Sequence, residues 1–144
     1  MNLKKVRKTL RYESIREVLS DGYVRYEVLP SNPNWPAAYL VLGKDPASGK
    51  LNVMQAGVGD WHQHFDQYKN PDRNVGAALT FLSDVVAGRV CLLAEYDARD
   101  RYVGGICYPN SARVAYSLHG SFDSGKAVKR MQYQFNREPQ IESR

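Results

Sequence analysis

The alternation of apolar and polar residues predicts a meander of three antiparallel strands in the first half of the chain. Residues 23–29 alternate between apolar and charged side chains, which is typical of a half-buried strand. Residues 37–43 are apolar on both sides, as in a central strand, and residues 51–57 return after a turn at 44–50. The loop at 30–36 carries three prolines. We expect the three strands to pair in chain order.

A helical period follows at about residues 71–87. Asn70 is a favourable N-cap, and Pro71 suits the first helical position. Apolar side chains then recur every three or four residues, and Gly88 allows the left-handed conformation that ends a helix. This is the strongest helix signal in the chain, and we expect the helix to pack across one face of the sheet.

The N-terminal region is open to two interpretations. Ser14 and Glu17 have the spacing of a capping box, which predicts a short helix at 14–20 that stops at Asp21–Gly22. The competing prediction is a longer helix that starts near Leu3.

Strand patterns return after the long helix. They are predicted at residues 90–96, 102–108, 112–118 and 127–135, followed by a polar, flexible tail at 136–144. The predicted fold class is therefore α+β: one antiparallel sheet of about five to seven strands, with the long helix packed on it and a short N-terminal helix. The 144 residues suit a single domain, 1–144.

Charge is concentrated at the start of the chain. The net charge is +5, and five basic residues fall within residues 1–11, where no acidic residue occurs. Without them the chain has as many basic as acidic residues. This basic arm is either solvated or a contact surface, and the chain lacks the usual nucleic-acid-binding motifs, so direct nucleic-acid binding is not expected.

Hydropathy and cysteine content limit the cellular setting. No apolar run approaches the roughly 20 residues of a membrane span, so we expect no membrane association. Two cysteines, Cys91 and Cys107, make a disulfide framework improbable and favour a cytoplasmic location. Depending on the length of the loop between their strands, Cys91 faces either Cys107 or Tyr108. Two small buried side chains are a better interpretation than a cross-strand disulfide.

The segment GDWHQHFDQY, residues 59–68, holds the side chains best suited to metal binding or acid–base catalysis. His62 and His64 are one residue apart, so on a strand both rings face the same side, and Asp66 is a candidate third metal ligand. General acid–base catalysis would need a cleft and a bonded partner. The structural alternative buries Trp61 and Phe65 in the core and leaves the histidines at a junction between sheet and helix. We favour the structural alternative, and we expect no cofactor and no catalytic residue.

The turn between the strands at 90–96 and 102–108 is a candidate protein-binding tip. It is rich in charged residues, and tyrosines stand on both sides of it. Acidic residues elsewhere could extend this surface. The predicted partner-binding residues are Asp60, Asp66, Asp72, Tyr96, Asp97, Arg99, Asp100, Arg101 and Tyr102.

The order of these segments resembles bacterial polymorphic-toxin immunity proteins, including those of contact-dependent growth inhibition systems. The resemblance covers roughly residues 23–108. The matching residues are Trp61, His62, His64, Phe65, Asp66, Leu79, Phe81, Leu82, Gly88, Gly104 and Gly105. The resemblance implies a small cytoplasmic protein, not an enzyme, that binds a cognate toxin C-terminal domain, in some cases a nuclease, and blocks its active site or an essential surface. Inhibitors of nucleases are often acidic, and this chain departs from that expectation.

Two other functions stay open at this point. A small metal-dependent enzyme or metal-binding protein would be centred on His62, His64 and Asp66. A nucleic-acid-binding accessory protein would use the basic arm at 1–11. The sequence does not predict the oligomeric state.

Overall fold

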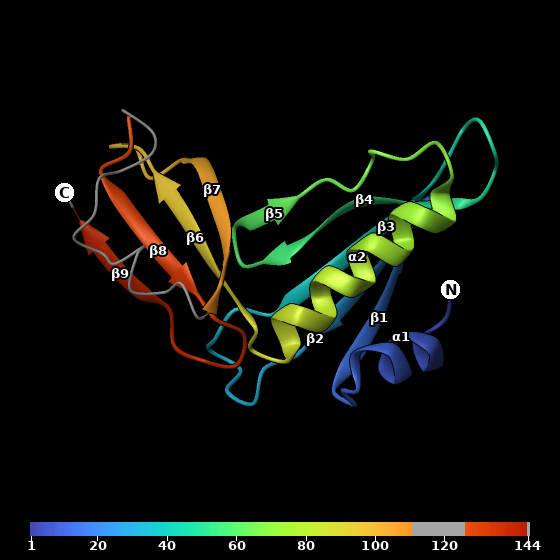
Figure 1. The fold of residues 1–144 in the computed structure, drawn as a ribbon, viewed down its shortest axis with the longest axis horizontal. Helices are drawn as coiled ribbons and strands as arrows, with labels where there is room; N and C mark the ends of the chain where they lie inside the picture. Colours follow the sequence, from blue (N-terminus) through green and yellow to red (C-terminus); the bar gives the residue numbers. More distant parts are fainter. Residues whose placement is uncertain (111–125, 144) are drawn as a thin grey trace.

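Two antiparallel sheets lie side by side, and a long helix packs against one of them (Figure 1). This computed structural model describes residues 1–110 and 126–143. The α+β class is therefore confirmed, but the single predicted sheet is wrong, because the strands divide into a five-stranded and a four-stranded sheet. None of the helices in the described ranges is long and apolar enough to span a membrane.

The five-stranded sheet follows the order of the chain. Its strands are β1 (Ile15–Ser20), β2 (Tyr23–Val28), β3 (Ala38–Lys44), β4 (Leu51–Val58) and β5 (Trp61–Gln63). The meander of β2, β3 and β4 is confirmed. Strand β5 was not predicted; it has three residues and returns along β4 after a tight turn at Gly59, where φ is 57°.

The predicted helix at 14–20 is wrong, because this segment is strand β1. It pairs with β2 across a two-residue turn at Asp21–Gly22, with Ser20 opposite Tyr23. Gly22 has φ 74°, the left-handed conformation that favours glycine in such turns. The Asp–Gly pair is therefore a hairpin turn and not a helix stop. The competing prediction is correct about the start, since helix α1 spans Leu3–Leu10.

Helix α1 lies within the segment predicted as a basic arm. The Asn2 side chain caps it by accepting a hydrogen bond from the Lys5 amide at 2.9 Å. Val6 and Leu10 are buried in the main core, and Lys4, Lys5 and Lys8 are exposed. Arg7 is partly buried and donates a hydrogen bond to the Ile15 carbonyl at 3.1 Å. The segment at 1–11 is thus an amphipathic helix that contacts α2 and β1.

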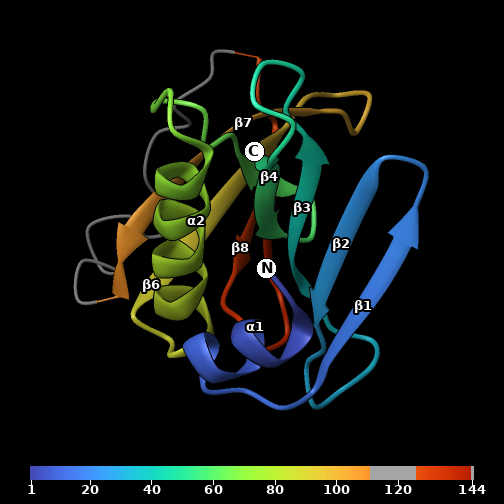
Figure 2. The same ribbon diagram turned by 90° about the vertical axis from the view of Figure 1, so that its right-hand side faces the viewer.

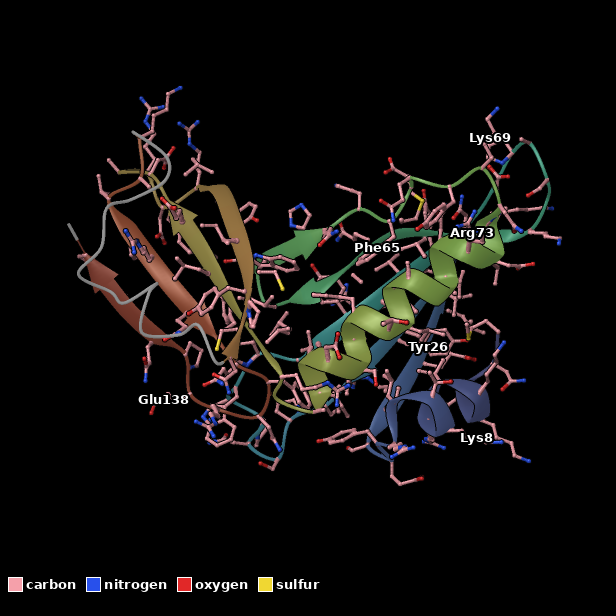
Figure 3. All side chains as sticks on the ribbon, in the orientation of Figure 1. Lys8, Tyr26, Phe65, Lys69, Arg73 and Glu138 are labelled. Carbon is pink, nitrogen blue, oxygen red and sulfur yellow. The ribbon has the colours of Figure 1, made fainter. Side chains whose placement is uncertain are left out.

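Helix α2 (Pro71–Val86) confirms the prediction of the long helix in detail. Asn70 accepts a hydrogen bond from the Asp72 amide at 2.9 Å, and Gly88 has φ 73°. The apolar stripe packs on β3 and β4, where Leu82 is fully buried. The side chains of Tyr26 and Phe65 also lie in this core, whereas Lys8, Lys69 and Glu138 lie at the edges of the molecule (Figure 3).

The four-stranded sheet has the order β7-β6-β8-β9. Its strands are β6 (Val90–Tyr96), β7 (Tyr102–Pro109), β8 (Lys129–Tyr133) and β9 (Gln140–Ser143). Three of them lie where strands were predicted, and the predicted strand at 112–118 falls outside the described residues. The segment 136–144, predicted as a flexible tail, contains β9, which pairs with β8.

The cysteines do not form a disulfide. Cys91 pairs in register with Tyr108, and Leu92 pairs with Cys107, so the alternative that placed Cys91 opposite Tyr108 is correct. A register shift between Glu95 and Tyr96 produces this pairing. Cys91 is buried as predicted, but Cys107 is exposed.

Candidate functional site

The five-stranded sheet has one face turned away from α2, which we call the outer face. The strand register aligns its side chains in rows that cross the sheet. One row runs from β1 to β5, and a second row runs from β1 to β4. A short third row lies near the turn between β1 and β2, and Met54 lies at the register shift in β4. The first row is Arg16, Glu27, Tyr39, Gly57 and His62, and the second row is Val18, Arg25, Val41 and Gln55. The third row is Ser20, Tyr23 and Gly43, and the three rows with Met54 make up the outer face.

Charged side chains of β1 and β2 form a ladder on this face, which Tyr39 of β3 extends. Glu27 forms ion pairs with Arg16 and, at 3.1 Å, with Arg25. The Arg16 hydrogen bond, together with the charges of both arginines, holds the pKa of Glu27 below its usual value although partial burial opposes this. The Arg25 guanidinium also lies 4.4 Å from the centre of the Tyr39 ring. Arg25 thus contacts both the Glu27 carboxylate and the Tyr39 ring.

Large apolar side chains gather beside this ladder. Tyr23 is 47% exposed and Met54 46% exposed, and both lie over Gly43. A Cβ atom at Gly43 would be 3.0 Å from the Met54 sulfur and 3.3 Å from the Tyr23 ring. Val18, in the adjacent β1, is 38% exposed. The hairpin of β1 and β2 that carries Val18 and Tyr23 projects from the side of the molecule away from α2 (Figure 2).

The segment GDWHQHF joins the two sheets and α2. Trp61 and Phe65 are buried and pack on Phe81 of α2, with ring centres 5.4 and 5.6 Å apart respectively. The structural interpretation of these two aromatic residues is therefore confirmed. His62 lies at the β5 end of the outer face, where its ring is 5.2 Å from the ring of Tyr102 in β7.

A hydrogen-bonded cluster lies behind this junction. The Tyr96 hydroxyl donates to Asp60 at 2.8 Å and lies 3.0 Å from the Tyr133 hydroxyl. Burial raises the pKa of Tyr96 strongly, and the hydrogen bonds with Tyr133 and Asp60 raise it further. Tyr96 is 3% exposed, so it stabilises the core and does not reach the surface as the predicted anchor. Tyr102 is partly exposed beside it.

The predicted binding tip at 97–101 is an exposed turn with its charges paired locally. Asp97 accepts from the Arg101 amide and forms an ion pair with the Arg101 guanidinium at 2.9 Å. The hydrogen bond from the Arg101 amide lowers the pKa of Asp97, although desolvation opposes this shift. Arg99 donates its amide to Asp97 at 2.9 Å, and Asp100 pairs with Lys129 of β8. These contacts join the residues of the turn to one another and to β8.

The remaining predicted residues are not brought together. Asp72 lies at the start of α2 and pairs with Lys50 at 3.5 Å, and Asp66 is exposed in the segment between β5 and α2. Glu95, another acid that could extend an acidic patch, is buried. The described acidic residues therefore do not form one acidic surface, and only Asp60 and the tip lie near Tyr102.

The metal-site alternative named Asp66 as a candidate third ligand beside the two histidines. Within residues 1–110 and 126–143, no group of three histidine, cysteine or carboxylate side chains is placed to hold a metal ion. Asp66 therefore does not complete a set with His62 and His64. A metal could be held here by the two imidazoles alone, with solvent in the other positions.

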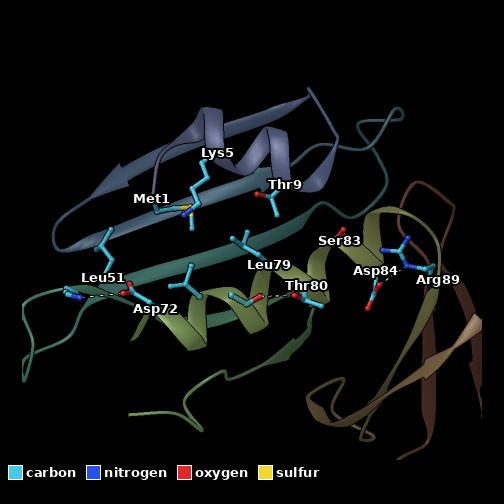
Figure 4. Close-up of a pocket in the computed structure, with 13 residues that line it drawn as sticks. Met1, Lys5, Thr9, Leu51, Asp72, Leu79, Thr80, Ser83, Asp84 and Arg89 are labelled. Carbon is cyan, nitrogen blue, oxygen red and sulfur yellow. Dashed lines mark hydrogen bonds and ion pairs between the residues drawn. The ribbon is translucent and has the colours of Figure 1, made fainter. Parts of the chain in front are cut away.

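A separate groove lies between α1 and α2 (Figure 4). Its volume of about 650 Å³ suits a small ligand, and Leu79 contributes to its apolar floor. Lys50 pairs with Asp72 on the rim. Asp84 pairs with Arg89 at 2.7 Å. The Thr80 hydroxyl in the lining donates a hydrogen bond to the Gly76 carbonyl of the same helix at 3.0 Å.

The outer face was not predicted as a surface from the sequence. The exposed Val18 was assigned to a helix, and neither Tyr23 nor Met54 was singled out. The Asp21–Gly22 pair between two segments with strand character was the signal that could have found the hairpin. The position of Met54 depends on a register shift in β4, which no pattern in the sequence indicates.

Comparison with known protein families, with curated proteins and with solved structures finds no match for this chain.

Proposed function

We propose that this chain is a non-enzymatic immunity protein that binds a cognate bacterial toxin domain and blocks its active site or an essential surface. The observation that supports the proposal is the outer face, where exposed apolar side chains and ion-paired arginines share one side of the sheet. Tyr23 and Met54 are both nearly half exposed. Tyrosine, methionine and arginine are the residue types enriched at protein interfaces.

The order of this face favours binding as a preformed surface. Arg25 is held by Glu27 and by the Tyr39 ring, so little side-chain freedom would be lost when a partner covers it. A partner with a carboxylate opposite Arg16 or Arg25 would gain association rate and specificity.

The interface extends beyond the outer face in this proposal. Five strands of about six residues cover an area of roughly 20 Å by 20 Å. This area is smaller than the surface of about 800 Å² that a stable interface buries on each partner. Tyr102 packs on His62 at the β5 end, next to the turn at 97–101. The predicted residues at this turn, with Asp60 and Tyr102, would then form the polar rim.

The test uses co-expression with the toxin domain encoded by the gene directly upstream. In the double variant Tyr23→Ser/Met54→Ser, growth in the presence of the active toxin should be lost and the two proteins should no longer co-purify. The matched control is Leu19→Ser/Ile141→Ser, which removes two exposed apolar side chains, 70% and 60% exposed, outside the outer face. The control should still protect the cell.

Protection that is equal in both double variants would contradict the position of the interface. No toxicity from the upstream domain, or toxicity that the wild-type chain does not relieve, would contradict the function itself. Circular dichroism of both variants separates loss of binding from loss of folding.

A further inference from the structure

His62 and His64 both use the same ring nitrogen to bind the backbone. Nδ1 of His62 lies 3.0 Å from the Asp60 carbonyl oxygen, and Nδ1 of His64 lies 2.8 Å from the Met54 carbonyl oxygen. A carbonyl oxygen can only accept a hydrogen bond, so Nδ1 carries the proton in each ring. In the neutral imidazoles, Nε2 is then the nitrogen with the free lone pair.

This arrangement is the one that orients histidines for metal binding. A metal-bound imidazole usually donates its other N–H to a carboxylate or a backbone carbonyl, which fixes the tautomer and the ring direction. Here two backbone carbonyls, one from the turn before β5 and one from β4, do this for two neighbouring rings.

The separation of the rings suits one shared ion. Their centres are 5.5 Å apart, and the ring planes are at 85°. Two imidazoles bound to one ion at about 2.0–2.1 Å have centres roughly 4.5–5.5 Å apart for bond angles of about 90–120°. The observed spacing is at the upper end of this range. Tyr102 packs on the His62 ring and limits its movement.

We propose that His62 and His64 form a bidentate site for a divalent transition-metal ion of the class that prefers imidazole, namely Zn²⁺, Ni²⁺ or Cu²⁺. The two imidazoles leave coordination positions that water would fill, and no third ligand lies within residues 1–110 and 126–143. His64 is exposed, so the ion is reached directly from solvent. The site adjoins the proposed toxin-binding face, because His62 lies at the β5 end of that face, and it goes beyond the proposed function because it concerns metal binding alone.

The test is a calorimetric titration of the untagged chain, freed of metal with EDTA, with Ni²⁺. Ni²⁺ is preferred because Cu²⁺ would also oxidise the exposed Cys107 thiol. We expect one saturable ion per chain. His62→Ala and His64→Ala should each weaken binding by about tenfold or more, because each variant destroys the chelate. Ni²⁺ should also raise the melting temperature of the wild type but of neither variant.

The matched control is His119→Ala, which removes the third histidine and lies outside the described residues. This variant should bind Ni²⁺ as the wild type does. The proposal is overturned by the absence of saturable binding, by single variants that keep the wild-type affinity within about twofold, or by an equal loss in His119→Ala. Two independent ions per chain would also overturn it. The readout involves no toxin, so it is separate from the test of the proposed function.

Discussion

At the scale of single residues, two glycines show how differently the same substitution acts. A Cβ atom at Gly57 would be 1.9 Å from the Trp61 carbonyl oxygen, a backbone atom that β4 and β5 hold in place. Gly76 is inside α2, and a Cβ there would meet nothing within 4 Å.

We therefore predict opposite effects on the free energy of unfolding. Gly57→Ala should destabilise the fold by about 3 kcal/mol or more, because the β4–β5 hairpin must move. Gly76→Ala should stabilise it by about 0.5–1 kcal/mol, because alanine loses less backbone freedom in a helix. Urea denaturation of both variants measures the difference. A small effect of Gly57→Ala would mean that the β4–β5 hairpin has room for a Cβ atom at this position.

Glu27 gives a prediction about pH. Its pKa is lowered in the folded state, mainly by the Arg16 hydrogen bond, so the folded state binds fewer protons than the unfolded state. The stabilisation is complete above the unfolded pKa of about 4.3 and is lost as the pH falls through the lower folded pKa. Because the Arg16 side chain is 61% exposed, we expect only about 0.5 kcal/mol.

Glu27→Gln should therefore be slightly less stable than the wild type at pH 7, and the difference should shrink as the pH falls through the lowered folded pKa of Glu27. Chemical denaturation at pH 7 and at low pH measures this. A difference that is unchanged at low pH would show that the carboxylate charge has no part in it.

These residue-level features were the least accessible from the sequence. Glu27 and Arg25 were correctly placed on the outward side of a strand by alternation. Their partner Arg16 was assigned to a helix, so the ladder could not be foreseen. The close approach at Gly57 depends on β5, a strand too short to leave a pattern.

At the scale of the elements, Asn74 connects α2 to the segments around it. It is fully buried, its Oδ1 accepts from the Tyr68 amide at 3.0 Å, and its Nδ2 donates to the Tyr68 carbonyl at 2.9 Å. Nδ2 also lies 3.1 Å from Asn52 Oδ1 in β4. One side chain thus joins the helix, the loop before it and the sheet.

Asn74→Ala should lower the free energy of unfolding by about 2–3 kcal/mol, since it leaves the Tyr68 groups without this partner. Asn70→Ala, which removes the exposed cap of the same helix, should cost about 1 kcal/mol. Thermal or urea unfolding of the two variants compares them. Equal effects would show that burial of the Asn74 network adds nothing.

The elements with local signals were predicted well. Helix α2 has its cap, its apolar stripe and its glycine stop in consecutive residues, and β2, β3 and β4 alternate or are continuously apolar. The prediction for the β1 segment was wrong because a capping-box spacing at Ser14 and Glu17 competed with a hairpin signal at Asp21–Gly22. Tertiary pairing with β2 decided between them.

At the scale of the whole molecule, the division into two sheets could not be predicted. Nothing in the strand patterns says that β5 ends one sheet and that β6 begins another after α2. The arrangement of the two sheets also decides which of the predicted site residues lie close together. It brings Asp60, His62, Tyr96 and Tyr102 together and leaves Asp72 at the far end of α2.

The central claim is that the chain acts by covering a partner and not by chemistry. The most direct measurement is a titration of the upstream toxin domain's activity with the purified chain, with light scattering of the mixture. We expect inhibition to be complete at one chain per toxin domain. We also expect a 1:1 complex, which the double variant Tyr23→Ser/Met54→Ser should weaken. Complete inactivation by far less than one equivalent, without a stable complex, would contradict it.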